Sequence, residues 1–169
     1  TPMMEQYAPN LSKYLKENPE IDKMVKTDAG EYYAFPNLRS GDKLTLTSGP
    51  ILRKDWLDEL GLEAPETIED WETVLTGFRE KKSAAAPLSI NKVNKSLLFS
   101  MANAAYDFYV DGDTMKFGPA EPEFKEALTV LNRWFSKGLL DNNYAMTDTN
   151  LLDSNMLNGK SGATIASGG

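Results

Sequence analysis

Residues 49–82 constrain the fold of this chain more than any other stretch, because their local signals are dense and follow in a clear order. After a short extended segment, Trp56, Leu57 and Leu60 form an apolar stripe one helical turn long. Gly61 then stands where a left-handed residue ends such a helix, and Leu62 can fold back onto its last turn. The pattern therefore predicts a strand end, a short helix and a glycine stop.

A second helix follows in the same stretch. Pro65 cannot continue the first helix, and Thr67 with Asp70 three residues later has the spacing of a capping box. Apolar residues then recur on one face of a helix, which favours core packing: Ile68, Trp71, Val74, Leu75 and Phe78. Trp56 and Trp134 lie on similar stripes, so we expect all three tryptophans to be core residues and not ligand platforms.

Composition excludes several classes of function. The 169 residues are 41% hydrophobic and carry a net charge of −7 with a pI near 4.7, which disfavours nucleic acid and anionic membranes as partners. The chain has no Cys and no His, so it has no disulfides, thiolate chemistry or histidine base. No apolar run is long enough to span a membrane, and the N-terminus is not a signal peptide.

The remaining pattern alternates helices with short strands. Residues 9–25 predict a helix that is interrupted at Asn18-Pro19, and residues 32–35 predict an aromatic strand ended by Pro36. Asp111-Gly112 predicts the tip of a β-hairpin. The other predicted elements are a kinked extended segment at 44–52, strands at 87–90 and 163–166, and helices at 95–105, 122–137 and 148–157.

These motifs, in this order, resemble the family 1 extracellular solute-binding proteins of bacterial carbohydrate ABC importers. The resemblance rests on "RKDWLDELGL" followed by "PETIEDW", and then on a hairpin containing Asp-Gly, a helix ending "WFSKGLL" and "NGKSGA" before a strand. It implies one lobe of a periplasmic-binding-protein-like (type II) α/β Venus-flytrap, with a mixed sheet flanked by helices. Relatives are two to three times longer, so the chain is expected to be a truncated fragment.

The resemblance also implies a domain division. Residues 1–43 would supply a first-lobe helix and strand together with the crossing between lobes, and residues 44–169 most of the second lobe. An aromatic sugar platform would follow the last strand, beyond residue 169. A secretion signal and a lipid anchor are expected upstream, which would place the protein outside the cell as a surface lipoprotein or in the periplasm.

The function that the resemblance implies is non-catalytic capture of a carbohydrate or oligosaccharide by lobe closure, followed by docking on ABC permease subunits. No cofactor or metal is expected. Asp111 and Asp113 lack the spacing of a calcium loop and fit a turn better. Sugar rings stack on aromatic side chains, and their hydroxyls bond planar polar groups. By family architecture, the ligand-binding residues are Tyr33, Asn37, Arg39, Ser48, Arg53, Asn91, Asn94, Ser96 and Ser167.

Several of these residues have a second interpretation. Arg53 fits ligand contact and an ion pair with Asp55 or Glu59 equally well, and Asn91 and Asn94 fit helix capping at least as well as sugar binding. Tyr32, Tyr33 and Phe35 are expected to lie mostly in the core, with one of the two tyrosines reaching the cleft.

Two other classes of function compete with sugar capture. A structural or peptide-binding interaction module would gain support if the polar candidates proved buried and the cleft face apolar. A glycoside-active enzyme would need two carboxylates facing each other across a pocket, and the order of acidic residues does not suggest such a pair.

Overall fold

The computed structural model describes residues 2–39, 48–91 and 95–167, except for the side chains of residue 2 and residues 95–97. The chain divides into two compact units, Thr1–Thr45 and Leu46–Gly169.

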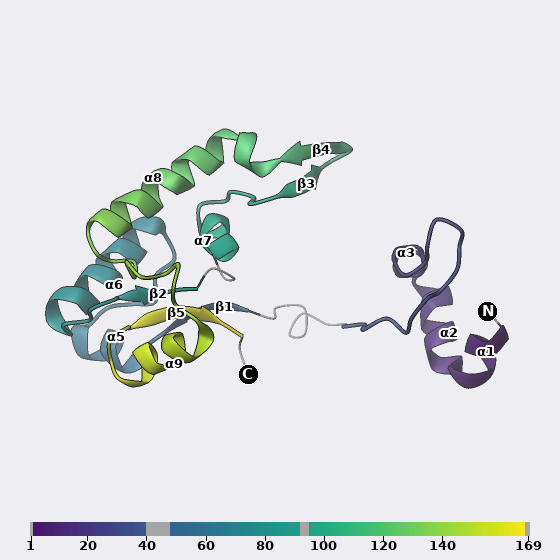
Figure 1. Cartoon of the computed structure of the whole chain (residues 1–169), viewed down its shortest axis with the longest axis horizontal. Coiled ribbons are helices and arrows are strands. Elements are labelled where there is room, and N and C mark those ends of the chain that lie inside the picture. Colours follow the sequence, from purple (N-terminus) through teal and green to yellow (C-terminus); the bar gives the residue numbers. More distant parts are fainter. Residues whose placement is uncertain (1, 40–47, 92–94, 168–169) are drawn as a thin grey trace. The chain divides into compact units, whose positions relative to one another are not determined.

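The described part of the first unit contains the short helices α1 (Pro2–Tyr7), α2 (Pro9–Glu17) and α3 (Pro19–Met24) (Figure 1). Proline opens α2 and α3, where its missing N–H costs no helical hydrogen bond. Asn18 separates these two helices and donates its side-chain N–H to the Tyr14 carbonyl at 2.8 Å. The predicted interruption at Asn18-Pro19 is confirmed.

The predicted aromatic strand at residues 32–35 is wrong. This stretch forms no strand in the structure, and Tyr33 and Phe35 are 83% and 72% exposed, so the expected core role of these two rings is wrong as well. A strand needs a partner for its backbone hydrogen bonds, and no described residue pairs with this stretch. Tyr32 is half-buried, and its hydroxyl donates to the Asp22 carboxylate.

The second unit is built on a three-stranded sheet in the order β1-β5-β2. β1 (Gly49–Leu52) runs antiparallel to β5 (Ala163–Ala166), and β2 (Leu88–Ser89) runs parallel to β5. A further parallel bridge joins Leu88 to Leu140. The helices around this sheet are α5 (Lys54–Leu60), α6 (Ile68–Lys81), α7 (Lys95–Met101), α8 (Pro122–Ser136) and α9 (Thr149–Leu157). This mixed α/β arrangement agrees with the predicted fold class.

Several of these helices begin and end at the residues that the sequence predicts. Gly61 and Gly138 both have φ = +64°, the left-handed conformation that glycine adopts without steric cost. Thr67 and Asp70 form both hydrogen bonds of the capping box at the start of α6. The helix predicted over residues 95–105 is shorter than expected, because α7 ends at Met101 and Asn103 takes a left-handed φ of 53°.

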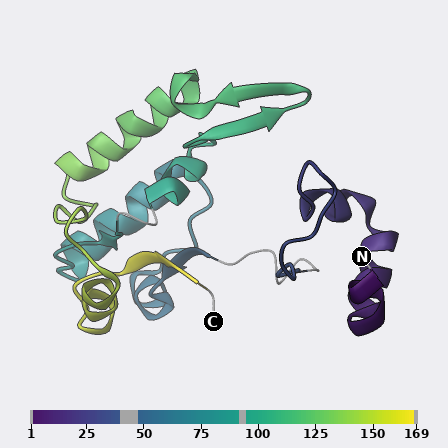
Figure 2. The same cartoon turned by 45° about the vertical axis from the view of Figure 1, so that its right-hand side comes forward.

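The predicted hairpin is present as β3 (Phe108–Asp111) and β4 (Thr114–Phe117), and a short 3₁₀ turn (Gly118–Ala120) connects it to α8. Gly112 occupies the first loop position with φ = +59°, as a type II′ turn requires. Lys116 on β4 pairs with Asp111 at 2.7 Å, so this carboxylate is engaged within the hairpin. Figures 1 and 2 show the hairpin extending from the start of α8 away from the sheet.

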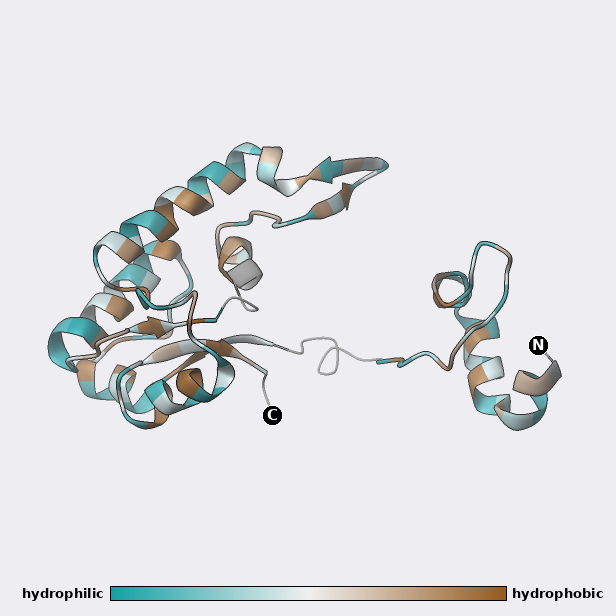
Figure 3. Cartoon of the chain, viewed as in Figure 1, coloured by the Kyte–Doolittle hydropathy of each residue, from teal (hydrophilic) through white to brown (hydrophobic). Residues whose placement is uncertain are grey.

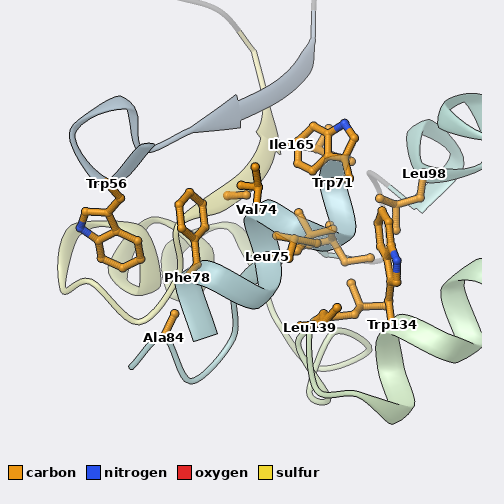
Figure 4. Packing of buried hydrophobic residues seen from close by; sticks show 14 of the residues in the cluster. Trp56, Trp71, Val74, Leu75, Phe78, Ala84, Leu98, Trp134, Leu139 and Ile165 are labelled. Carbon is orange, nitrogen blue, oxygen red and sulfur yellow. The ribbon is translucent and has the colours of Figure 1, made fainter. Parts of the chain in front are cut away.

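The core lies between one face of the sheet and helices α5, α6 and α8. Its three tryptophans, Trp56, Trp71 and Trp134, are at most 7% exposed, which confirms their predicted core role. Trp56 meets the edge of Phe78 with ring centroids 5.3 Å apart (Figure 4). Along α8, hydrophobic and hydrophilic residues alternate as an amphipathic helix requires (Figure 3).

Candidate ligand-binding site

Three of the predicted site residues meet at one edge of the sheet. β2 and β5 are parallel, so both strands end at the same edge, and antiparallel β1 begins there with Gly49 paired to Ala166. Ser48 therefore precedes β1 at the edge where Ser167 follows β5, and Asn91 follows β2. We call this set, Ser48, Asn91 and Ser167, the polar edge.

The members of the polar edge differ in accessibility. Ser167 is exposed and Ser48 is half-buried, so both hydroxyls can meet a ligand. Asn91 is only 7% exposed and lies beneath the surface of the edge. Its side chain is therefore better placed to support the edge than to cover a ligand.

A layer of buried polar side chains lies on the sheet face opposite the apolar core. Side chains alternate along strands, so Leu88 and Ala163 enter the core while Ser89 and Thr164 face the other side, where α9 packs. We call this set the polar layer, and each of its members is at least nine-tenths buried: Ser89, Asp141, Thr147, Asn155, Ser161 and Thr164.

Hydrogen bonds connect most of the polar layer. Ser89 is the central member: it donates to Asp141 Oδ2 at 3.3 Å and accepts from Ser161 Oγ at 2.8 Å and Asn155 Nδ2 at 3.2 Å. Thr147 Oγ1 lies 3.3 Å from Asp141 Oδ2. Thr164 Oγ1 is buried with no hydrogen-bond partner in the described part of the chain.

An open groove of about 940 Å³ lies in the second unit and reaches the end of β2. Ile90, directly before Asn91, lines it, as do Tyr144 and side chains of α7 and α8. Its lining combines aromatic and aliphatic side chains with the polar groups of Lys125 and Asn132. Its aromatic and larger aliphatic lining includes Ile90, Phe99, Tyr106, Leu128, Phe135 and Tyr144, and we call their surface the aromatic groove.

Arg53 lies at the opposite end of β1. Its backbone N–H donates to the Gly162 carbonyl at 2.8 Å, beyond the start of β5. Its guanidinium donates two hydrogen bonds to Asp55, at 2.8 and 2.5 Å, and stands 4.8 Å from the centroid of the Trp56 ring. The Arg53 hydrogen bonds lower the pKa of Asp55 to about 2. Of the two interpretations of Arg53, the structure thus shows the ion pair.

The structure does not fix where the other five predicted side chains lie relative to the polar edge. Tyr33, Asn37 and Arg39 are exposed residues of the first unit. Asn94 lies outside the described residues. Ser96 lies in α7, but its side chain is outside that description.

Sequence reasoning missed Asp141 and Tyr144. Both follow the Leu140 bridge, which runs parallel to β2 and so ends at the same edge. The available signal was the pair Leu139-Leu140 between Gly138 and Asp141, a short apolar run bounded by a glycine stop and polar residues.

The described residues contain neither a metal-ligand cluster of three or more acidic, His or Cys side chains nor a helix long and apolar enough to cross a bilayer.

No family model matches the chain. Among curated proteins, it is 29% identical over 158 residues to the fructooligosaccharide ABC transporter substrate-binding protein FusA of Streptococcus pneumoniae, covering 82% of this chain and 29% of FusA. It is 25% identical over 177 residues to lipoprotein LipO of Bacillus subtilis, covering 94% of this chain and 34% of LipO. Among solved structures, alginate-binding protein AlgQ2 superposes with a TM-score of 0.76 and 28% identity, over 97% of this chain and 35% of AlgQ2.

The chain is thus similar in sequence and structure to carbohydrate ABC transporter substrate-binding proteins. Its fold is the type II periplasmic-binding-protein fold of its structural neighbours. It spans about a third of the length of the substrate-binding proteins that it matches. These relatives are named as binding proteins and not as enzymes.

Proposed function

We propose that this chain is part of a non-catalytic extracellular receptor that captures an oligosaccharide for an ABC importer. The observation that carries the proposal is that the aromatic groove reaches Ile90, the residue directly before Asn91 of the polar edge. Pyranose and furanose rings need apolar faces to stack on and polar groups for their hydroxyls, and these two surfaces supply both. The relatives support the choice of ligand, because FusA is named for fructooligosaccharides and AlgQ2 for alginate.

In this proposal, residues 44–169 form most of one lobe, and residues 1–43 supply a first-lobe segment with the crossing between lobes. Binding would occur as a second lobe closes over the polar edge and excludes water. The closed form would then dock on permease subunits. The protein would act at the cell surface or in the periplasm, and LipO, a named lipoprotein, supports a lipid anchor.

An NMR titration of the ¹⁵N-labelled chain tests the proposal. Kestose, as a neutral fructooligosaccharide, and an alginate oligosaccharide, as an anionic one, would be added to millimolar concentration. We expect amide shifts at Ser48, Ser167 and Tyr144, because these residues border the site. The double variant Ser48→Ala/Ser167→Ala should weaken binding several-fold.

Ser136→Ala is the matched control, because Ser136 is exposed at the end of α8, away from the polar edge. Shifts that cluster around Arg53, at the opposite end of β1, would contradict the proposed site. A folded sample that responds to neither sugar would contradict sugar binding by this chain.

The apolar character of the groove also favours a second candidate, a peptide-binding module. Leu128 and Phe135 are 48% and 40% exposed on one side of α8, and Asn91 is buried. An amphipathic helical peptide added in the same titration separates the two functions. Shifts along α8 with the peptide, and none with either sugar, would favour peptide binding.

A further inference from the structure

Asp141 is a buried carboxylate whose placement has a cost. It is 5% exposed, and within the described part of the chain it forms no ion pair with a lysine or arginine. An ionised carboxylate removed from water is unfavourable unless hydrogen-bond donors replace the solvent. The groups that face Asp141 are neutral: the Ser89 hydroxyl, the Asn143 backbone N–H and the Thr147 hydroxyl, whose single proton is shared with the Asn143 carbonyl at 3.1 Å.

These donors come from two separate chain segments. The Ser89 hydroxyl belongs to β2, which leads directly into Ile90 and Asn91. The Asn143 N–H, 2.9 Å from Oδ1, and the Thr147 hydroxyl belong to the segment that carries Tyr144. The backbone adds a further link, because the Asp141 N–H donates to the Leu88 carbonyl at 2.9 Å. One residue thus connects the segment of the polar edge to the segment of the aromatic groove.

The carboxylate also fixes the direction of the hydrogen bonds. It can only accept, so the Ser89 proton points toward Asp141. The Ser89 oxygen then has both lone pairs free for its two donors, Ser161 and Asn155. The side chains that hold β2 against α9 and the start of β5 therefore depend on a negative charge at residue 141.

We propose that Asp141 is a positioning residue of the candidate sugar site, which sets the spacing between the polar edge and the aromatic groove. The proposal rests on the proposed function. Asp141 contacts no ligand itself in this proposal. It holds the end of β2, where Asn91 supports the polar edge, at a fixed separation from Tyr144, so that a sugar finds the polar edge and its aromatic partner already in place.

The substitution Asp141→Asn tests the charge while it keeps the shape. An amide nitrogen at the Oδ2 position would donate to Ser89 and Thr147 instead of accepting from them. Ser89 would then face three donors with two lone pairs, and its own proton would lose its acceptor. We expect the protein to stay folded, with the two segments shifted relative to each other.

The matched control is Asp153→Asn, the same chemical change on the exposed surface of α9. In the free protein, we expect D141N to move the amide resonances of both Ser89–Asn91 and Asn143–Thr147, and D153N to move neither group. In the sugar titration, D141N should weaken binding by tenfold or more at unchanged helix content, and D153N should bind like the wild type.

Wild-type-like binding by D141N would overturn the proposal, as would free-state resonances of residue 91 that do not move. If D141N fails to fold, Thr147→Val removes one donor and keeps the carboxylate. That variant should lose about threefold in affinity, and unchanged affinity would again overturn the proposal. A wild-type chain that binds no sugar would instead overturn the proposed function. The free-state resonances would still decide whether Asp141 sets the spacing between the two segments.

Discussion

The indole N–H of Trp134 on α8 donates a hydrogen bond of 3.3 Å to Oε2 of Glu72 on α6. Trp134 is 1% exposed, so its one polar group needs an acceptor at the border of the core. Arg133 Nε donates to the same oxygen at 2.9 Å, and the Lys137 ammonium pairs with the other oxygen. One carboxylate therefore clamps α8 onto α6 and accepts the hydrogen bond of the buried Trp134 indole.

Glu72→Gln should lower the free energy of unfolding at neutral pH by about 1–2 kcal/mol, because charged hydrogen bonds become neutral ones. The Lys137 hydrogen bond, followed by that of Arg133, lowers the pKa of Glu72 below its ordinary value of 4.5. A lowered pKa stabilises the folded state at pH values above the ordinary pKa. This stabilisation is lost as the pH falls through the lowered pKa.

Urea unfolding at pH 7 and at a series of acidic pH values checks this prediction. The difference in the free energy of unfolding between wild type and E72Q should shrink as the pH falls below 4.5. Glu126→Gln is the control, because Glu126 is exposed on α8, the helix that Glu72 joins to α6. A gap between wild type and E72Q that stays constant from neutral to acidic pH would show that the charge on Glu72 is not what stabilises the clamp.

Thr164→Val should leave stability unchanged or raise it by about 1 kcal/mol. The Thr164 hydroxyl is buried without a partner among the described residues, so the native protein bears a desolvation cost that valine removes. Thr147→Val is the contrasting variant, because the Thr147 hydroxyl is hydrogen-bonded. Thermal unfolding should rank T164V at or above wild type and T147V below it, and the reverse order would contradict the polar-layer geometry.

Thr67→Ala should destabilise the protein by about 1 kcal/mol, because it removes the hydroxyl that accepts from the Asp70 N–H at 3.1 Å in the capping box. Thr73→Ala on the same helix is the control. The Thr73 hydroxyl donates to the Glu69 carbonyl, which a helix does not require, and alanine has the higher helix propensity. Thermal unfolding followed by circular dichroism should show a lower melting temperature for T67A and not for T73A.

Gly162→Ala should destabilise by about 3 kcal/mol, because a Cβ there would stand 2.2 Å from the Phe78 ring. Phe78 is completely buried and packed by Trp56, so the ring has no space to move into. Gly49→Ala is the matched control, since a Cβ at Gly49 meets nothing within 4 Å. Equal melting temperatures for the two variants would contradict the tight approach of Gly162 to the core.

The sequence predicted those parts of the fold that local chemistry decides. Gly61, the Thr67–Asp70 capping box and the apolar stripe of α8 each act within one or two helical turns, and all three are confirmed. The aromatic stretch at residues 32–35 was predicted wrongly because a strand depends on a distant partner, which local pattern does not reveal.

The candidate site likewise contains residues that local pattern predicts and one that depends on a long-range contact. Ser48 and Ser167 follow from where strands begin and end, and the structure brings them to one edge. Asp141 could not be found this way, because its role depends on the bridge between Leu88 and Leu140. The Ser89–Asp141 hydrogen bond beside that bridge joins residues 52 apart in the sequence. Whether these residues contact a ligand stays a prediction.

Pro50 lies in β1, an outer strand of the described sheet. Arg53 donates to Gly162 and the register alternates, so the N–H groups of residues 49 and 51 face β5 while position 50 points outward. Proline has no N–H to offer at that outward position, and another strand approaching this side would find a donor missing from the ladder. Pro50 thus disfavours edge-to-edge pairing on this side of the sheet, and a substitution such as Pro50→Thr would restore the missing donor.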